Sequence, residues 1–155
     1  MVHSAYDSFQ LVTDSPAKID AVESYGSKLF LGCNDGSLRI YVPESSISDG
    51  LSIPGDSKLL NEPYVHERTI NGFSKKQIIA MEAFRSKELL FSLSESIAFH
   101  KLPTLETVAV ISKARGANVY SWDDRRGFLC FARQKRVSIF RHDGKVLKLL
   151  LFFFF

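Results

Sequence analysis

The sequence predicts an all-β fold of antiparallel sheets. Two observations lead to this prediction: short apolar runs rich in Val, Ile, Phe and Tyr recur along the chain, and turn-forming residues separate them. The 155 residues are 45% hydrophobic and 24% charged, as in ordinary globular domains. This composition excludes a collagen-like chain, a disordered chain and a small disulfide-stapled scaffold.

The first predicted unit contains a hairpin whose turn is Asp35-Gly36, because this dipeptide supplies the positive φ angles that a tight turn requires. An insertion at residues 43–64 is rich in Ser, Asp, Gly and Pro, so we expect a surface loop before the last strand. We also expect a separate strand over residues 9–13. The predicted strands of the unit itself are residues 19–25, 28–33, 37–42 and 67–73.

Two further units of the same design follow. The hairpin of the second unit is joined through Ser94-Glu95 and that of the third through Gln134-Lys135. In each unit one apolar run precedes the hairpin and another follows it. The predicted strands are residues 78–84, 88–93, 96–102 and 105–112 in the second unit, and residues 117–122, 128–133, 136–141 and 145–150 in the third.

The spacing of the units predicts a partial β-propeller. Ile79 and Val119 occupy equivalent positions 40 residues apart, whereas Ile19 and Ile79 are 60 apart because of the insertion. Four-stranded units repeating at about 40 residues are typical of propeller blades. Since a closed ring needs at least four blades, we expect about three blades here, as the first part of a larger ring. An eight-stranded sandwich is the alternative fold.

This reading divides the chain into two parts. Residues 1–148 form the partial propeller domain, with its loop insertion at 43–64, and residues 149–155 form an apolar low-complexity tail. Low-complexity sequence then stands where a fourth blade should begin, so we expect residues 151–155 to be a premature end of the chain.

Several segments carry a resemblance to a known family. Residues 19–42, IDAVESYGSKLFLGCNDGSLRIYV, resemble the first blade of a citron-homology (CNH) domain. Residues 77–83 (QIIAMEA) and 111–118 (ISKARGAN) resemble the vacuolar protein sorting thirty-nine family, which includes a subunit of the HOPS tethering complex and its paralogue, the transforming growth factor β receptor-associated protein. The likeness covers residues 1–148.

The resemblance implies a non-enzymatic protein-interaction module of a membrane-tethering complex. Such a module acts in vesicle-mediated protein transport, autophagy and the fusion of late endosomes with vacuoles or lysosomes. Its implied partners are a Rab-type GTPase and tethering subunits of the HOPS or CORVET type, and its implied place is the cytoplasmic face of the late endosome or vacuole. Two alternatives remain open: a CNH regulatory module that binds small GTPases in signalling, and a peripheral module that binds anionic lipids.

Charge is distributed unevenly along the chain. Residues 1–112 have 10 basic and 14 acidic side chains, a net charge of −4, whereas residues 113–148 have 10 basic and 3 acidic ones, a net charge of +7. A basic region of this kind marks an acidic partner, unless exposed strands and turns simply carry this charge. We expect turns at one rim to present the candidate partner-binding residues to an acidic GTPase surface or an anionic membrane; these residues are Arg125, Arg126, Arg133, Lys135 and Arg136. Nucleic acid is not expected, because aromatic residues are not interleaved with the basic ones.

No motif indicates catalysis, a cofactor or a metal. The chain has no nucleophile elbow, phosphate-binding loop or metal-ligand spacing, so we expect no catalytic, cofactor-binding or metal-binding residues. Cys33 and Cys130 occupy nearly equivalent strand positions and are expected to pack in the core. His100 is expected at the edge of a blade face, and Trp122 as a hydrophobic plug rather than a blade signature. The sequence also lacks an apolar run long enough for a membrane-spanning helix, and its start does not resemble a secretory signal.

Overall fold

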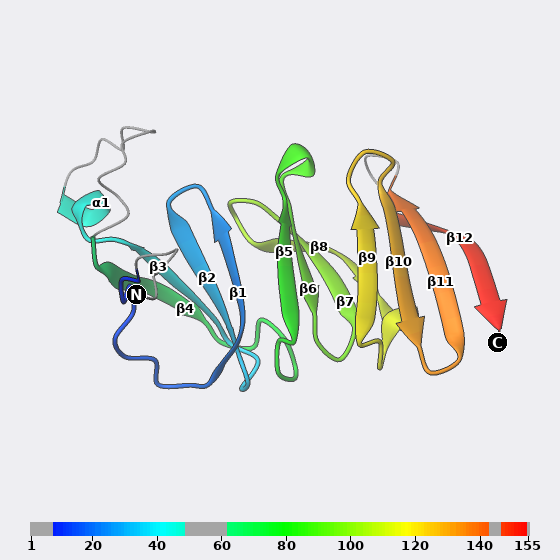
Figure 1. Cartoon of the computed structure of the whole chain (residues 1–155), viewed down its shortest axis with the longest axis horizontal. Helices are drawn as coiled ribbons and strands as arrows, with labels where there is room; N and C mark the ends of the chain where they lie inside the picture. The colour runs from blue at the N-terminus through cyan, green and yellow to red at the C-terminus, as the bar shows by residue number, and fades with distance from the viewer. Residues whose placement is uncertain (1–7, 49–61, 143–146, 155) are drawn as a thin grey trace, which may run out of the picture.

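Three four-stranded antiparallel sheets make up the architecture (Figure 1). The computed structural model describes residues 8–48, 62–142 and 147–154. The sheets lie side by side in chain order, and within each one the strands follow one another as a meander. The all-β prediction is confirmed, and the two-sheet sandwich is not the fold.

The first sheet forms around the predicted hairpin. Gly36 has a φ of 80°, and the Asp35 carboxylate accepts hydrogen bonds from the backbone N–H of Ser37 at 2.9 Å and from its hydroxyl at 2.6 Å. These two bonds favour the ionised carboxylate and hold the pKa of Asp35 below its ordinary value. The strands are β1 (Ile19–Tyr25), β2 (Lys28–Cys33), β3 (Leu38–Pro43) and β4 (Tyr64–Ile70), and the short helix α1 (Ser45–Ser48) follows β3.

The second and third sheets repeat this arrangement, and each has a 3-10 turn close to one of its strands. The second sheet contains β5 (Ala80–Phe84), β6 (Leu89–Leu93), β7 (Ile97–Lys101) and β8 (Glu106–Ile111), with η2 (Arg85–Lys87) between β5 and β6. The third contains β9 (Val119–Asp123), β10 (Phe128–Arg133), β11 (Arg136–His142) and β12 (Leu147–Phe154), with η3 (Ser112–Ala114) before β9.

The strand expected over residues 9–13 is absent from the described part of the chain, and that prediction is wrong. The segment instead contacts the first sheet through isolated hydrogen bonds: the carbonyl oxygen of Leu11 accepts from the N–H of Tyr64 at 3.0 Å, and that of Asp14 accepts from the Tyr41 hydroxyl at 3.4 Å. Pro16 follows closely and has no N–H to give to a strand ladder.

The boundaries that differ most from the prediction are those of β4 and β12. β4 begins at Tyr64, within the predicted insertion, because residues 64–66 pair with the end of β3 after a shift of register at Ile40/Tyr41. β12 extends to Phe154, which lies opposite Arg136 of β11. The strand therefore crosses residue 148, where the sequence suggested a boundary. The division into a domain and a tail stays a prediction, and residues 49–61 of the insertion lie outside the described residues.

An apolar core joins the first sheet to the second. Phe30 and Ile40 of the first sheet and Leu90 of the second are each at most 1% exposed and belong to one cluster. Gly32 lies where the sheets approach most closely, because a Cβ at this position would lie 2.7 Å from Cγ2 of Ile78. The absence of a side chain at residue 32 is thus a packing requirement.

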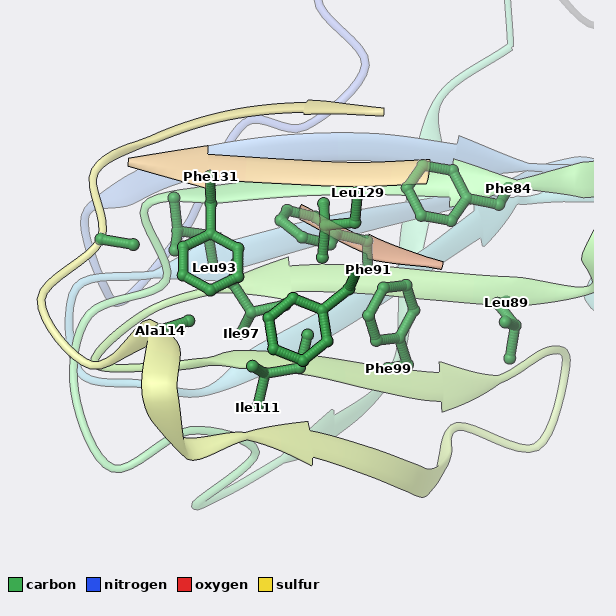
Figure 2. Close-up of a cluster of buried hydrophobic side chains, with 12 residues drawn as sticks. Phe84, Leu89, Phe91, Leu93, Ile97, Phe99, Ile111, Ala114, Leu129 and Phe131 are labelled. Atoms are coloured by element: carbon green, nitrogen blue, oxygen red, sulfur yellow. The ribbon is translucent and has the colours of Figure 1, made fainter. Parts of the chain in front are cut away.

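A second core, rich in aromatic rings, joins the second sheet to the third (Figure 2). Phe91 is fully buried, and its ring centroid lies 5.7 Å from that of Phe99 and 4.3 Å from that of Tyr120. Leu129 and Phe131 of β10 close this cluster from the third sheet. The two cores account for the face-to-face packing of the three sheets.

The first strands of the sheets are also linked by polar contacts. The Glu23 carboxylate of β1 accepts from the N–H of Ala83 in β5 at 2.7 Å, and the Tyr120 hydroxyl of β9 donates to Glu82 of β5 at 3.1 Å. Burial and the nearby carboxylate raise the pKa of Tyr120 to about 12, so this hydroxyl keeps its proton at neutral pH.

The meander order gives each sheet two distinct ends. The linkers β4–β5 and β8–β9 and the turns β6–β7 and β10–β11 lie at one end, which we call the linker end (Figure 1). The turns β5–β6, β7–β8 and β9–β10 lie at the opposite end. This distinction decides which functional side chains can act together.

Candidate protein-binding groove

The five basic residues predicted to bind a partner are divided between the two ends. Arg133, Lys135 and Arg136 flank the β10–β11 turn at the linker end, whereas Arg125 and Arg126 lie in the β9–β10 turn at the opposite end. The whole of β10 separates the two groups. The expectation that one rim gathers all five is therefore wrong, because successive turns of a meander lie at opposite ends of the strand they share.

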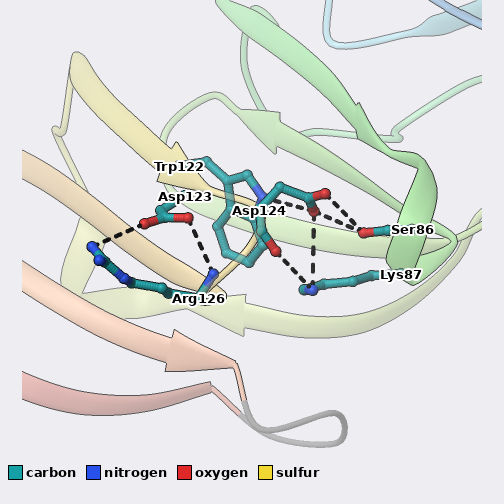
Figure 3. Close-up of polar contacts among 6 residues, drawn as sticks. All are labelled: Ser86, Lys87, Trp122, Asp123, Asp124 and Arg126. Carbon is teal, nitrogen blue, oxygen red and sulfur yellow. Dashed lines mark hydrogen bonds and ion pairs between the residues drawn. The ribbon is translucent and has the colours of Figure 1, made fainter.

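At the opposite end, the turn residues fix the third sheet to the second (Figure 3). The Asp124 carboxylate accepts from the Ser86 hydroxyl at 2.8 Å, and Nζ of Lys87 donates to the Asp124 carbonyl at 3.2 Å. The Ser86 bond is the main reason why the pKa of Asp124 lies below its ordinary value. Arg126 is held locally, with its guanidinium 3.7 Å from the carboxylate of Asp123.

Trp122 belongs to the same structural cluster. Its indole stacks on Phe84 of the second sheet, with a centroid distance of 4.1 Å and an interplanar angle of 10°, and its Nε1 donates to Asp124 at 3.4 Å. The side chain is part of the packing between two sheets, as a hydrophobic plug should be.

At the linker end the structure forms a cleft of about 640 Å³. Side chains of β6, β7 and β8, of both linkers and of the end of β10 line it. Of the predicted partner-binding residues, Arg133 lines this groove. Lys75 and Arg115 also line it, although they were not among the predicted residues. Arg115 lies in the ISKARGAN segment. The two cations of this segment, next to a linker glycine, are the sequence feature from which a basic contribution to the groove could have been predicted.

The floor of the groove holds a buried polar network centred on His100. The imidazole is 1% exposed, and its Nε2 lies 3.0 Å from the hydroxyl of Ser92 and its Nδ1 3.1 Å from that of Thr107. Its ring stacks on Phe73 of the β4–β5 linker at 4.2 Å. The expectation that His100 lies at the edge of a face is wrong, because Phe73 covers it.

Burial sets the protonation state of this histidine. It lowers the pKa of His100 from 6.5 to about 4, so the ring is neutral at pH 7, with one nitrogen donating and the other accepting. A Ser–His pair can act as nucleophile and base when a carboxylate orients the ring. Here the hydroxyl of Thr107, and not a carboxylate, lies beside the second ring nitrogen of His100. The Ser92 hydroxyl is also poorly accessible, since Ser92 is 4% exposed. These hydrogen bonds are therefore suited to holding the floor of the groove rigid.

The rim of the groove is positively charged. Among the described residues that line the groove, three are cations and one is a carboxylate: Lys75, Arg115 and Arg133, and Glu95. Nε of Arg115 lies 3.2 Å from Glu95, and the Arg133 guanidinium donates to the Arg115 carbonyl at 3.1 Å. The second bond orients Arg133 along the rim.

Neither cysteine takes part in the groove. Cys33 is fully buried, as predicted for a core residue, and Cys130 is half-buried in β10. Within the described ranges, His, Cys, Asp and Glu side chains do not form a group of three or more that could hold a metal ion. Across the same residues, no helix has the length and apolar character needed to cross a membrane.

Solved structures confirm the propeller architecture. The crystal structure of the RRP9 WD40 repeats matches 94% of this chain and 41% of its own, with a TM-score of 0.64 and 9% sequence identity. The structure of U3-55K matches 94% of this chain and 42% of its own, with the same TM-score and 10% identity. At such low identity the likeness concerns the fold alone. The prediction of a partial propeller is confirmed.

Known sequences identify the relatives. No family model matches the chain, so the citron-homology resemblance stays a prediction. The Vam6/Vps39-like proteins of Mus musculus and Homo sapiens are 26% identical over 125 residues, which is 79% of this chain and 14% of theirs. Vacuolar sorting protein 39 of Arabidopsis thaliana is 72% identical over 145 residues, which is 93% of this chain and 14% of that protein. Over the residues that the two share, the chain therefore belongs to the Vps39 family.

Proposed function

We propose that the chain is a protein-interaction module of a vacuolar sorting protein that tethers membranes in vesicle-mediated transport. The observation that supports this function is the 72% identity to Vacuolar sorting protein 39 over 93% of the chain. The module acts by binding and not by catalysis. It works at the cytoplasmic surface of late endosomes and vacuoles, where it assembles with tethering subunits of the HOPS or CORVET type. The same machinery serves autophagy.

The proposed direct partner is a Rab-type GTPase, and the proposed contact is the β10–β11 turn. Arg133, Lys135 and Arg136 bring three cations to this turn, and the Lys135 side chain is exposed. Charges at the edge of an interface accelerate association with an acidic surface. Arg125 and Arg126 stand outside this contact, because they lie at the opposite end.

A charge-reversal experiment tests the contact. GTP-loaded Rab-type GTPases are bound to the full chain, to Lys135→Glu/Arg136→Glu, and to the matched control Arg125→Glu/Arg126→Glu. We expect the first variant to bind at least about tenfold more weakly and to lose most of its salt dependence, with the control close to the parent chain. Equal weakening by both variants, or a chain that floats on anionic vesicles but binds no GTPase, would contradict the proposal.

A further inference from the structure

The groove at the linker end has the features of a preformed binding site. It adjoins the β10–β11 turn, where the proposed GTPase contact lies, and shares Arg133 with it, whereas Lys135 and Arg136 do not line the groove. Its volume of about 640 Å³ lies in the range of clefts that hold small ligands. A ligand bound here would be a second one, distinct from the GTPase of the proposed function.

Hydrogen bonds hold the floor of the groove in one arrangement. The Ser74 hydroxyl donates to that of Ser94 at 2.5 Å, and Ser94 donates to the carbonyl of Lys76 at 2.9 Å. Together with the bonds of His100 to Ser92 and Thr107, these contacts satisfy the buried polar groups before any ligand arrives. A site ordered in advance loses little conformational entropy on binding.

The charge of the lining selects an anionic ligand. Three cations and one carboxylate give the lining an excess of two positive charges. Glu95 neutralises only part of the rim, since it pairs with Arg115, whose side chain remains 70% exposed. Exposed Lys75 approaches from the other linker, so a ligand lying in the groove meets cations from both sides.

The lining also contains apolar surface next to the cations. Val110 is 58% exposed on β8, and the half-buried ring of Phe73 lies over His100. A free phosphate needs only the cations, and a flat bilayer does not enter a concave site between two linkers. A polypeptide with alternating acidic and aliphatic side chains matches both kinds of surface.

We propose that the groove between the β4–β5 and β8–β9 linkers binds an acidic segment of a protein partner. Lys75, Arg115 and Arg133 bind its anionic side chains, and Val110 and Phe73 contact its aliphatic ones. The anion is a carboxylate or a phosphoserine, since both accept charge-assisted hydrogen bonds from guanidinium groups.

Fluorescence anisotropy with three labelled octapeptides tests the inference. In these peptides Val alternates with phosphoserine, with Glu or with Ser, and the protein is the full chain. We expect at least one acidic peptide to bind and the serine peptide not to. The first two peptides distinguish the phosphate from the carboxylate as the preferred anion.

Matched variants place the binding in the groove. Lys75→Gln/Arg115→Gln should weaken binding of the acidic peptide about tenfold, whereas Arg125→Gln/Arg126→Gln, which removes the same charge at the opposite end, should leave it unchanged. Circular dichroism of both variants checks that they are folded, and Lys75→Gln alone, which removes one charge at an exposed side chain, supplies a milder change.

Three results would overturn the inference: no binding of either acidic peptide, equal binding of the serine peptide, or equal loss in both double variants. Lys135 and Arg136 are unchanged in this experiment, so its failure would leave the GTPase contact untouched.

Discussion

The buried imidazole of His100 should make the stability of the protein depend on pH. Its folded pKa is about 4, whereas an exposed histidine in the unfolded chain titrates near 6.5. Between these values the unfolded state binds a proton that the folded state does not, so stability is complete above pH 6.5 and is lost as the pH falls toward 4. Replacement by Gln removes the titration and keeps a hydrogen-bonding group beside Ser92 and Thr107.

The size of the effect follows from the two pKa values. Relative to pH 7, this histidine should reduce the free energy of unfolding by about 2 kcal/mol at pH 5 and by about 3 kcal/mol at pH 4. The carboxylates of Asp35 and Asp124 have lowered pKa values and remain ionised at pH 5. They therefore do not contribute to the change in stability between pH 7 and pH 5.

Urea denaturation at pH 7, 6 and 5 measures this loss in the parent chain, in His100→Gln and in a control, His66→Gln, which removes an exposed histidine. The parent and the control should lose about 2 kcal/mol more than His100→Gln between pH 7 and pH 5. Parallel losses in all three proteins, or an imidazole that titrates near 6.5 by NMR in the folded chain, would show that burial does not shift the pKa of His100.

Three further substitutions, two of them with a matched control, test the packing by urea denaturation. Gly36→Ala should lower the free energy of unfolding by about 2 kcal/mol or more, because φ is 80° and the new Cβ would lie 2.3 Å from a linker carbonyl oxygen. Its control, Gly26→Ala, has a φ of 60° and open space around the new Cβ, so it should lower this free energy by about 1 kcal/mol. Equal costs would contradict the close approach. Phe91→Ala should cost about 3–5 kcal/mol, against less than about 0.5 for Val108→Ala at a 53% exposed position. Trp122→Phe should cost about 1 kcal/mol, since it keeps a ring against the second sheet and loses one donor; a loss as large as that of Phe91→Ala would show that the indole N–H matters more than the stack.

Local signals predicted most of the strands. The β2 and β10 bounds match the expected runs at residues 28–33 and 128–133, because turn residues and strand-forming residues agree there. Asp35-Gly36 fixed the first hairpin through a conformation that few other residues adopt. The composition of residues 9–13 is typical of a strand. A strand also needs a neighbouring strand with free backbone N–H and C=O groups, and the sequence does not show whether one lies beside this segment.

The groove was less accessible from the sequence. His100 is buried because Phe73, 27 residues earlier in the chain, stacks on it, and that contact depends on how two sheets pack. Arg115 and Lys75 lie in separate linkers that the propeller arrangement brings to one end. The separation of Arg126 from Arg133, by contrast, was predictable, since a strand lies between their turns.

Hydrogen–deuterium exchange of the full chain with a GTP-loaded Rab-type GTPase tests most directly the claim that the linker end is the binding end. We predict that amides of residues 133–136 become protected, while those of residues 85–88 and 124–127 at the opposite end exchange as in the free chain. Protection confined to residues 85–88 and 124–127, or no protection at saturating GTPase, would contradict the account.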